Sequence, residues 1–346
     1  MAQQKGWQGN FFEDFQIGQE LPCPTPRTVT SGDISAYISI TGDRTPVYCG
    51  PSGNVHPLVV FHTVFGQTVR YISLNARANL GYAAIRWLAP VKVGDTLKMD
   101  IKIVGLRENS NGKTGVVWVE NTATNQRDEV VMTFWRWVMI KKRDHGTSTQ
   151  WLENPVVPKL PKQVDAQELF VNHDVIPSQR ETVSELKFDA YEVGERVLHF
   201  DGQTLNSSDN MSFTRLFQNS AKVHFDAVMQ NGKPLIYGGV PISIGYAMAL
   251  NGFDNRLGIA AINSGAHVGP VFAGDTLYAF TDVVEKVALD DKVGALRLRL
   301  IVLKNQDPSL LDDVNAFQIQ TPNEKGGLSY DGAVILDLDY WELVAR

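Results

Sequence analysis

The sequence predicts an α+β fold made of two tandem copies of one unit, each a long helix wrapped by an antiparallel sheet. A shift of 176 positions aligns residues 12–18 with residues 188–194, and a shift of 180 aligns residues 89–97 with residues 269–277. A constant register followed by a small slip is typical of duplication with a loop insertion. The chain has 346 residues, of which 43% are hydrophobic, so it is long enough for two domains with buried cores.

The register of the repeat predicts which residues of the two copies are equivalent. The shift of 176 places Asp43 under Asn219 and Tyr48 under His224. We expect the same shift to hold at Asn75 with Asn251, and at Asn79 with Asn255, before it changes to 180. Different chemical groups therefore occupy the same two places of one template.

Each copy opens with a helix start signal and continues into a long apolar segment. The segments 30–33 and 206–209 place Ser, Thr or Asn and an acid where a helix N-terminus favours them. Residues 57–74 and 240–250 are predicted as the central helices. The first is interrupted by polar side chains, including His62, and this favours a core helix over a membrane span.

Strands follow the helix in each copy, because alternating apolar and polar positions are rich there in β-branched and aromatic residues. We expect them at residues 96–105, 114–122, 130–141, 277–287, 295–304 and 334–344. Residues 144–184 contain four prolines and little periodicity, so they are predicted as a linker. The expected domains are residues 1–143 and 185–346.

Composition excludes several classes of function. The net charge is −6, and no basic run is longer than residues 141–143, which argues against nucleic acid as the main partner. The first residues lack the apolar core of a signal peptide, and we expect a cytoplasmic protein. Cys23 and Cys49 have no ligand spacing and are interpreted as thiols. Metal, P-loop and dinucleotide motifs are not found.

The segment around His224 is the strongest candidate for a catalytic site. An imidazole titrates near neutral pH and can take and return a proton, while Asn219 can orient a water molecule but cannot act as a base. The alternatives are a core histidine and a loop-capping asparagine. Asp43 is either an acid of the first copy or a turn residue, and Tyr48 is either a substrate contact or packing.

The template resembles the MaoC-like (R)-specific enoyl-CoA hydratases, which have a hot-dog fold. The resemblance rests on Asp43-Arg44-Thr45-Pro46-Val47-Tyr48 and Phe61-His62-Thr63 in the first copy, and on Asn219-Ser220-Ala221-Lys222-Val223-His224 and Tyr237-Gly238-Gly239 in the second. It covers nearly the whole chain and implies a double hot-dog, in which two antiparallel sheets each wrap around a long helix.

More narrowly, the chain is similar to the mesaconyl-CoA hydratase, or β-methylmalyl-CoA dehydratase, branch. This rests on segments such as Asn10-Phe11-Phe12-Glu13-Asp14-Phe15, Thr214-Arg215-Leu216 and Ala260-Ala261-Ile262-Asn263-Ser264-Gly265. Val240 stands where members of that branch often carry histidine. The resemblance implies a hydro-lyase that acts without a cofactor on a short branched or dicarboxylic enoyl-CoA, and a homo-oligomer that pairs double hot-dogs.

The chemistry of hydration assigns further candidate residues. The Gly238 and Gly239 amides at a helix start could bind the thioester oxygen, although two glycines also make plain turns. Arg215 could pair with a substrate carboxylate or form a surface ion pair, and His62 belongs either to a thioester-binding loop or to the core. Two other functions remain open: a thioesterase that uses Asp43 to activate water, and an acyl-CoA binding protein without catalysis.

Overall fold

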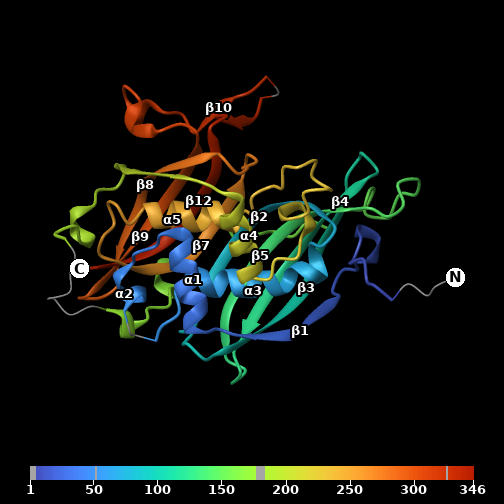
Figure 1. The fold of residues 1–346 in the computed structure, drawn as a ribbon, viewed down its shortest axis with the longest axis horizontal. Coiled ribbons are helices and arrows are strands. Elements are labelled where there is room, and N and C mark those ends of the chain that lie inside the picture. Colours follow the sequence, from blue (N-terminus) through green and yellow to red (C-terminus); the bar gives the residue numbers. More distant parts are fainter. Residues whose placement is uncertain (1–4, 51–52, 177–183, 325) are drawn as a thin grey trace.

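The structure is a computed structural model that describes residues 5–50, 53–176, 184–324 and 326–346. Its main feature is one ten-stranded sheet with the order β1-β3-β4-β5-β2-β7-β12-β9-β8-β6, in which every neighbouring pair is antiparallel (Figure 1). The strands are β1 (Glu20–Thr28), β2 (Ala76–Trp87), β3 (Thr96–Glu108), β4 (Thr114–Thr124), β5 (Val130–Lys141), β6 (Arg196–Thr204), β7 (Arg256–His267), β8 (Thr276–Ala288), β9 (Val293–Lys304) and β12 (Val334–Ala345). A separate hairpin pairs β10 (Gln320–Pro322) with β11 (Leu328–Tyr330).

The two copies are joined along β2 and β7, one strand from each. Tyr82 lies opposite Gly265 and Arg86 opposite Ala261 in this antiparallel pair. The prediction of a double hot-dog is confirmed, with one refinement. The two sheets expected, one around each helix, are the halves of one continuous sheet, because hydrogen bonding between β2 and β7 removes an exposed edge from each.

The central helices lie against the sheet, one for each half (Figure 1). They are α3 (Pro57–Ile72) and α5 (Gly239–Met248), close to the predicted ranges, and every residue of α5 is buried. A helix that is apolar on all sides belongs inside a protein core. The other helices are α1 (Ser31–Thr41), α2 (Pro46–Cys49) and α4 (Ser207–Leu216), with 3₁₀ turns η1 (Phe12–Asp14), η2 (Ala166–Glu168), η3 (His173–Val175), η5 (Phe188–Ala190), η6 (Lys222–His224), η7 (Pro308–Leu310) and η8 (Val314–Ala316).

Two capped helices begin where the sequence predicts them. The Thr30 side chain accepts a hydrogen bond from the Asp33 amide, and the Asp33 carboxylate accepts one from the Thr30 amide, which makes a capping box at α1. Asn206 and Asp209 repeat this arrangement at α4. The duplication therefore extends to the hydrogen bonds that begin each helix.

The register of the repeat changes earlier than the sequence suggested. Asn75 donates to the carbonyls of Gln8 and Asn10, and Asn255 makes the same contact with the carbonyls of Ser184 and Leu186. Asn75 is therefore equivalent to Asn255, so the pairings of Asn75 with Asn251 and of Asn79 with Asn255 were wrong. The extra residues of the second copy lie in the turns between η6 and α5, where a surface loop tolerates an insertion.

The six predicted strands are present, whereas β1, β2, β6 and β7 were not predicted. The sequence of β2 is Ala-Arg-Ala-Asn-Leu-Gly-Tyr-Ala-Ala-Ile-Arg-Trp, in which Ala, Asn and Gly have low strand propensity. Its conformation depends on partners on both sides, β5 and β7. Long-range pairing therefore decides the conformation of this segment against its local preference.

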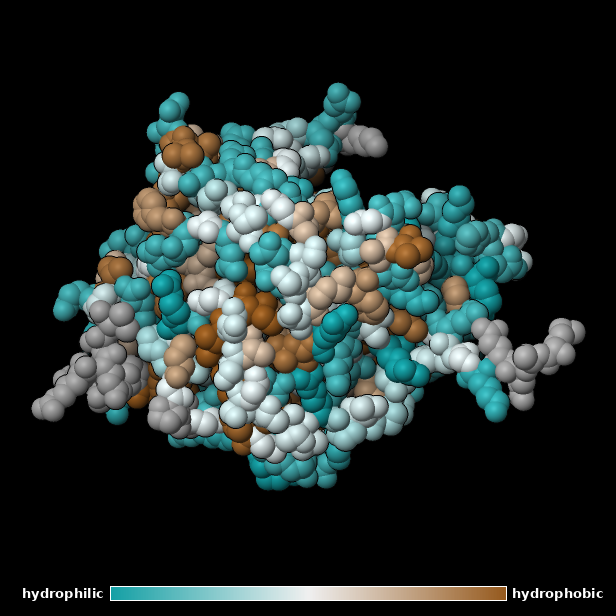
Figure 2. Space-filling model, in the orientation of Figure 1, coloured by the Kyte–Doolittle hydropathy of each residue, from teal (hydrophilic) through white to brown (hydrophobic). Residues whose placement is uncertain are grey.

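Hydrophobic side chains gather near the middle of the face in Figure 2, with hydrophilic residues around them. None of the helices in the described ranges combines the length and the apolar composition that crossing a membrane requires. Cys23 is buried and Cys49 is exposed, and both are free thiols.

A buried ion pair also connects the two halves. Asp43, which follows α1, is 1% exposed, and its Oδ2 lies 3.3 Å from Arg256 Nη2 at the start of β7. The same oxygen lies 3.3 Å from His56 Nε2. Burial opposes ionisation of this carboxyl, but Arg256 and His56 outweigh it and hold the pKa of Asp43 well below its usual range. Asp43 therefore forms part of the packing between the halves.

We expect Asp43→Ala to lower the free energy of unfolding by about 3 kcal/mol, because it leaves the Arg256 guanidinium buried without this partner. Asp201→Ala is the control. The Asp201 carboxylate is half exposed and lies 4.0 Å from Arg44, so its loss is expected to cost less than about 1 kcal/mol. Denaturant unfolding of both variants checks this. Equal effects would show that the buried pair has no special role in stability.

Candidate active site

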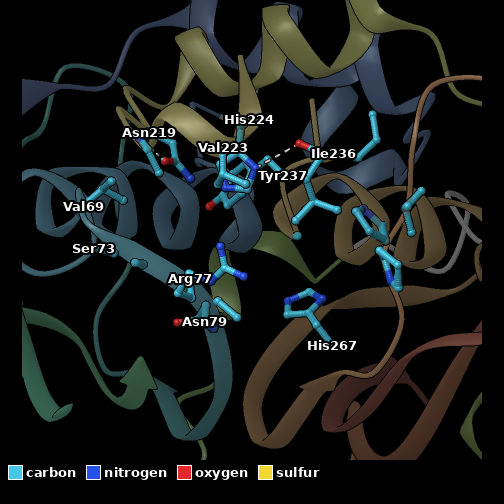
Figure 3. A pocket seen from close by; sticks show the side chains of 18 of the residues that line it. Val69, Ser73, Arg77, Asn79, Asn219, Val223, His224, Ile236, Tyr237 and His267 are labelled. Atoms are coloured by element: carbon cyan, nitrogen blue, oxygen red, sulfur yellow. Dashed lines mark hydrogen bonds between the residues drawn. The ribbon is translucent and has the colours of Figure 1, made fainter. Parts of the chain in front are cut away.

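A cavity of about 330 Å³ lies between the halves and is lined by both (Figure 3). The first half contributes the end of α3 and strands β2 and β5, and the second contributes the segment from Asn219 to Pro241 and the end of β7. Among the predicted site residues, the fold brings His224, Asn219 and Gly238 together in this cavity.

His224 ends η6 and lies in the cavity wall. Its Nδ1 is 3.0 Å from the Leu235 carbonyl oxygen, marked by the dashed line in Figure 3. A carbonyl only accepts, so Nδ1 carries the proton and Nε2 keeps its lone pair. Burial lowers the pKa of His224 to about 4, although the Leu235 hydrogen bond opposes this shift. The imidazole is therefore neutral at neutral pH and can act as a base.

Asn219 lies on the loop after α4 and is 4% exposed. Its Oδ1 accepts a hydrogen bond from the Ala221 amide at 3.1 Å. The carboxamide group therefore shapes the turn, and Nδ2 is left as its donor group. Tyr237 lines the same cavity, and burial raises the pKa of its hydroxyl well above the usual value, so it stays protonated and can donate.

Gly238 and Gly239 stand at the N-terminus of α5. Neither amide donates a hydrogen bond to any of the residues that the structure describes. A Cβ at Gly238 would lie 2.7 Å from the His267 ring, and one at Gly239 would lie 2.6 Å from the Tyr237 ring. Glycine is thus required for the close approach of two cavity side chains. Gly238 lines the cavity, whereas Gly239 lies just behind it.

Sequence reasoning did not single out His267, which ends β7 and also lines the cavity (Figure 3). Its Nε2 lies 3.3 Å from the Tyr82 hydroxyl. Burial, with a smaller contribution from nearby His224, lowers the pKa of His267 to about 4. The repeat could have drawn attention to His267. The shift of 180 pairs it with Trp87, two positions before the aligned segment that begins at Ala89, so the two copies carry different side chains at this place.

Arg136 and Asn79 were also missed. Arg136 is fully buried on β5, and Asn79 lies on β2, where neither polar atom of its side chain has a partner among the described residues. Both line the cavity. Their strands belong to the first copy, whereas the motif that holds Asn219 and His224 belongs to the second, so no local pattern connects them.

Besides Gly239, four predicted residues do not line the cavity. Asp43 is buried and held in the ion pair with Arg256 described above. His62 is fully buried on α3, and its Nε2 lies 2.8 Å from Ser243 Oγ on α5, so it holds the two central helices together. Tyr48 donates to the Leu257 carbonyl at 3.0 Å. Arg215 is exposed on α4, outside the cavity.

The first copy has a counterpart of the cavity, but its volume is only about 50 Å³. Trp87 and Tyr48 line it at the places that His267 and His224 occupy in the larger cavity. The Trp87 indole donates to the Pro57 carbonyl, which fixes the ring across this space. Phe170 and Val175, from the expected linker, also line it. Large side chains thus fill the related site of the first copy, whereas the cavity beside His224 stays open.

A groove of about 470 Å³ adjoins the open cavity, and Asn219 lines both. Arg70 from α3 and Arg215 from α4 line this groove, and none of the described residues lines it with an acidic side chain. Both guanidinium groups belong to exposed residues. The groove is therefore a cationic surface next to the site.

Comparison with known proteins shows the family to which the chain belongs. Residues 2–320 match the family described as mesaconyl-CoA hydratase. The β-methylmalyl-CoA dehydratase of Chloroflexus aurantiacus is 41% identical, covering 98% of this chain and 97% of that protein. The mesaconyl-CoA hydratase of Cereibacter sphaeroides is 42% identical, covering 98% of each.

Two solved structures share the fold. A protein from Chloroflexus aurantiacus, described as a MaoC domain protein dehydratase, superposes with a TM-score of 0.89 at 41% identity and covers 99% of each chain. A Mycobacterium tuberculosis protein with a double hotdog fold has a TM-score of 0.76 at 24% identity, covering 98% of this chain and 99% of that one. This chain is thus a double hot-dog protein that belongs to the mesaconyl-CoA hydratase family.

Proposed function

We propose that this protein adds water reversibly across the double bond of a short branched or dicarboxylic enoyl-CoA such as mesaconyl-CoA, in the cavity between its halves. The observation that carries the proposal is the state of His224. A hydrogen bond to Leu235 holds its Nδ1 proton, and burial keeps the ring neutral, so Nε2 is the basic atom. The names of the two similar proteins, a hydratase and a dehydratase, describe the two directions of this reaction.

In hydration, His224 Nε2 takes a proton from water while the water oxygen forms a bond to the β-carbon of the substrate. The electrons of the double bond move toward the thioester oxygen, which gives an enolate. The α-carbon then receives a proton from the imidazolium, which returns to its neutral form. One water molecule is consumed and the enzyme is unchanged. Dehydration follows the same steps in reverse.

The negative charge of the enolate needs donors. Gly238 lines the cavity, and its amide stands at the N-terminus of the ten-residue helix α5, where the partial positive charge of the helix dipole stabilises an anion. The Tyr237 hydroxyl and the Asn219 carboxamide NH₂ remain to orient the water molecule. The second copy thus supplies the reacting groups, and the first supplies the opposite wall through β2 and β5.

The cationic groove suits the phosphate groups of coenzyme A. Arg215 and Arg70 line it, and its lining has no acidic side chain from the part of the chain that the structure describes. The sequence suggested Arg215 as a partner for a substrate carboxylate. Its exposed position outside the cavity instead favours a phosphate that stays in solvent while the acyl group enters.

The thioesterase alternative depended on Asp43 as the activator of water, and Asp43 does not line the open cavity.

We also predict that the reaction needs no cofactor, that the protein is cytoplasmic and that it forms a homo-oligomer. The described residues hold no group of three or more His, Cys, Asp or Glu side chains that could bind a metal ion.

We expect His224→Ala to lower kcat/KM for mesaconyl-CoA by about 10² to 10⁴, because general base catalysis contributes in this range. His145→Ala, which removes an exposed imidazole, is the control and should retain full activity. Loss of the enoyl-thioester absorbance measures both, with crotonyl-CoA as a second substrate. A folded wild-type protein that consumes neither substrate would rule out the proposed reaction.

The pH dependence of hydration follows from the same group. Because burial lowers the pKa of His224 to about 4, the base stays neutral above this value. We expect kcat/KM to be constant from about pH 8 to 5 and to fall below pH 5 as Nε2 becomes protonated. Circular dichroism over the same range controls for unfolding. A fall centred near pH 6.5 would instead indicate a solvated histidine.

The substitution Arg215→Ala tests whether the groove binds the phosphate groups of coenzyme A. If Arg215 binds a phosphate of coenzyme A, the substitution should raise KM several-fold for mesaconyl-CoA and crotonyl-CoA alike, with little change in kcat. Steady-state kinetics with both substrates measure this. A larger effect on the dicarboxylic substrate would return Arg215 to the role of a carboxylate partner.

A further inference from the structure

Arg136 differs from the other buried cations of the molecule. Three cationic side chains are fully buried in the described part of the chain: Arg136, Lys142 and Arg256. Lys142 Nζ lies 2.6 Å from a Glu108 carboxylate oxygen, and Arg256 pairs with Asp43. Arg136 forms no ion pair with any described residue. Its charge therefore lacks the partner that the other two have.

The guanidinium of Arg136 still has free donors. Nη2 donates to Ser73 Oγ at 3.0 Å, while Nε and Nη1 have no partner among the residues described. The group lies 4.4 Å from the centre of the Phe65 ring, which supports it from one side. Arg136, Ser73 and Phe65 all line the open cavity. The unsatisfied donors thus belong to a side chain in the wall of the proposed active site.

This arrangement is unfavourable without a ligand. Burial lowers the pKa of Arg136 to about 10, so the side chain remains charged at neutral pH. An uncompensated buried charge is among the costliest features of a protein interior. Its polar neighbours Tyr82 and Tyr237 are neutral, because burial raises the pKa of both hydroxyls. Among the described residues that line the cavity, no carboxylate balances the charge.

The second copy has no arginine at the position equivalent to Arg136. Arg136 lies opposite Tyr82 in the pairing of β5 with β2, and Tyr340 lies opposite Ile262 in the equivalent pairing of β12 with β7. The shift of 180 makes Tyr82 and Ile262 equivalent, so the second copy has Tyr340 where the first has Arg136. The cation is therefore no general requirement of the fold.

We propose that Arg136 binds a carboxylate on the acyl group of the substrate and selects dicarboxylic acyl-CoA thioesters over monocarboxylic ones. The inference rests on the proposed function, because it assumes that the acyl group enters this cavity. A carboxylate provides the charge that Arg136 lacks and accepts from its free donors. The exposed Arg77 and Arg215 would gain less, since solvent already stabilises them.

Kinetics with two matched substrates test this selection. Mesaconyl-CoA and tiglyl-CoA share the same branched double bond, but tiglyl-CoA has a methyl group where mesaconyl-CoA has its carboxylate. We expect Arg136→Met to lower kcat/KM for mesaconyl-CoA about a hundredfold and to leave that for tiglyl-CoA unchanged or higher. Arg136→Lys, which keeps the charge, should recover part of the loss. Arg107→Met, which removes an exposed arginine, is the control.

Equal losses on both substrates would overturn the proposal and give Arg136 a structural role only. Stability offers an independent check. If the ligand-free protein bears an unpaired buried charge, Arg136→Met should keep or raise Tm, whereas a structural guanidinium would lower it on removal.

A binding experiment separates this proposal from the reaction itself. Methylsuccinyl-CoA and 2-methylbutyryl-CoA are saturated, and they differ by a carboxylate in place of a methyl group. Calorimetric titration should show wild type binding methylsuccinyl-CoA at least tenfold more tightly, and Arg136→Met removing this preference. A preference without turnover would reject the hydratase and keep the carboxylate site. Turnover without a preference would keep the hydratase and reject the carboxylate site.

Discussion

The antiparallel pairing of β2 with β7 is the constraint on which the rest of the structure depends. It joins two five-stranded halves into one sheet, and places the end of α3 and the start of β2 beside the segment of the second copy that holds Asn219 and His224. The contact between His62 on α3 and Ser243 on α5 fixes the helices across the same boundary. Since the cavity wall comes from both halves, neither half alone could form the cavity. The two halves of one chain therefore pair as two subunits of a dimer would.

The duplicated chain has two related sites. Different side chains at equivalent positions make one of them an open cavity and the other part of the packed core. In the first copy, Trp87 and Tyr48 fill the space that the second copy leaves open beside His267 and His224. Asp43, at the position of Asn219, forms a buried ion pair that connects the halves. The carboxylate at this position of the first copy thus stabilises the packing between the halves. Close packing and paired charges make the closed site part of the core.

Burial sets the charge state of each group in the open cavity. It keeps the histidines His224 and His267 neutral, because desolvation disfavours their cationic form. Arg136 stays charged in the same environment, because the intrinsic pKa of a guanidinium is far higher. A neutral base and a permanent cation thus lie in one apolar pocket. Such a combination suits an acyl group that carries a carboxylate and reacts with neutral water.

The amino-acid sequence by itself determined the duplication, both central helices, six long strands, and the second-copy motif that holds Asn219, His224 and Gly238. These features are local, because helix periodicity, strand alternation and motif spacing are written in neighbouring residues. Only the tertiary structure decided that β2 and β7 are strands, that Asp43 faces Arg256, and that Arg136 and His267 reach the cavity. The paired segments of β2 and β7 lie far apart along the chain, and a side chain's partner across such a separation leaves no local pattern in the sequence.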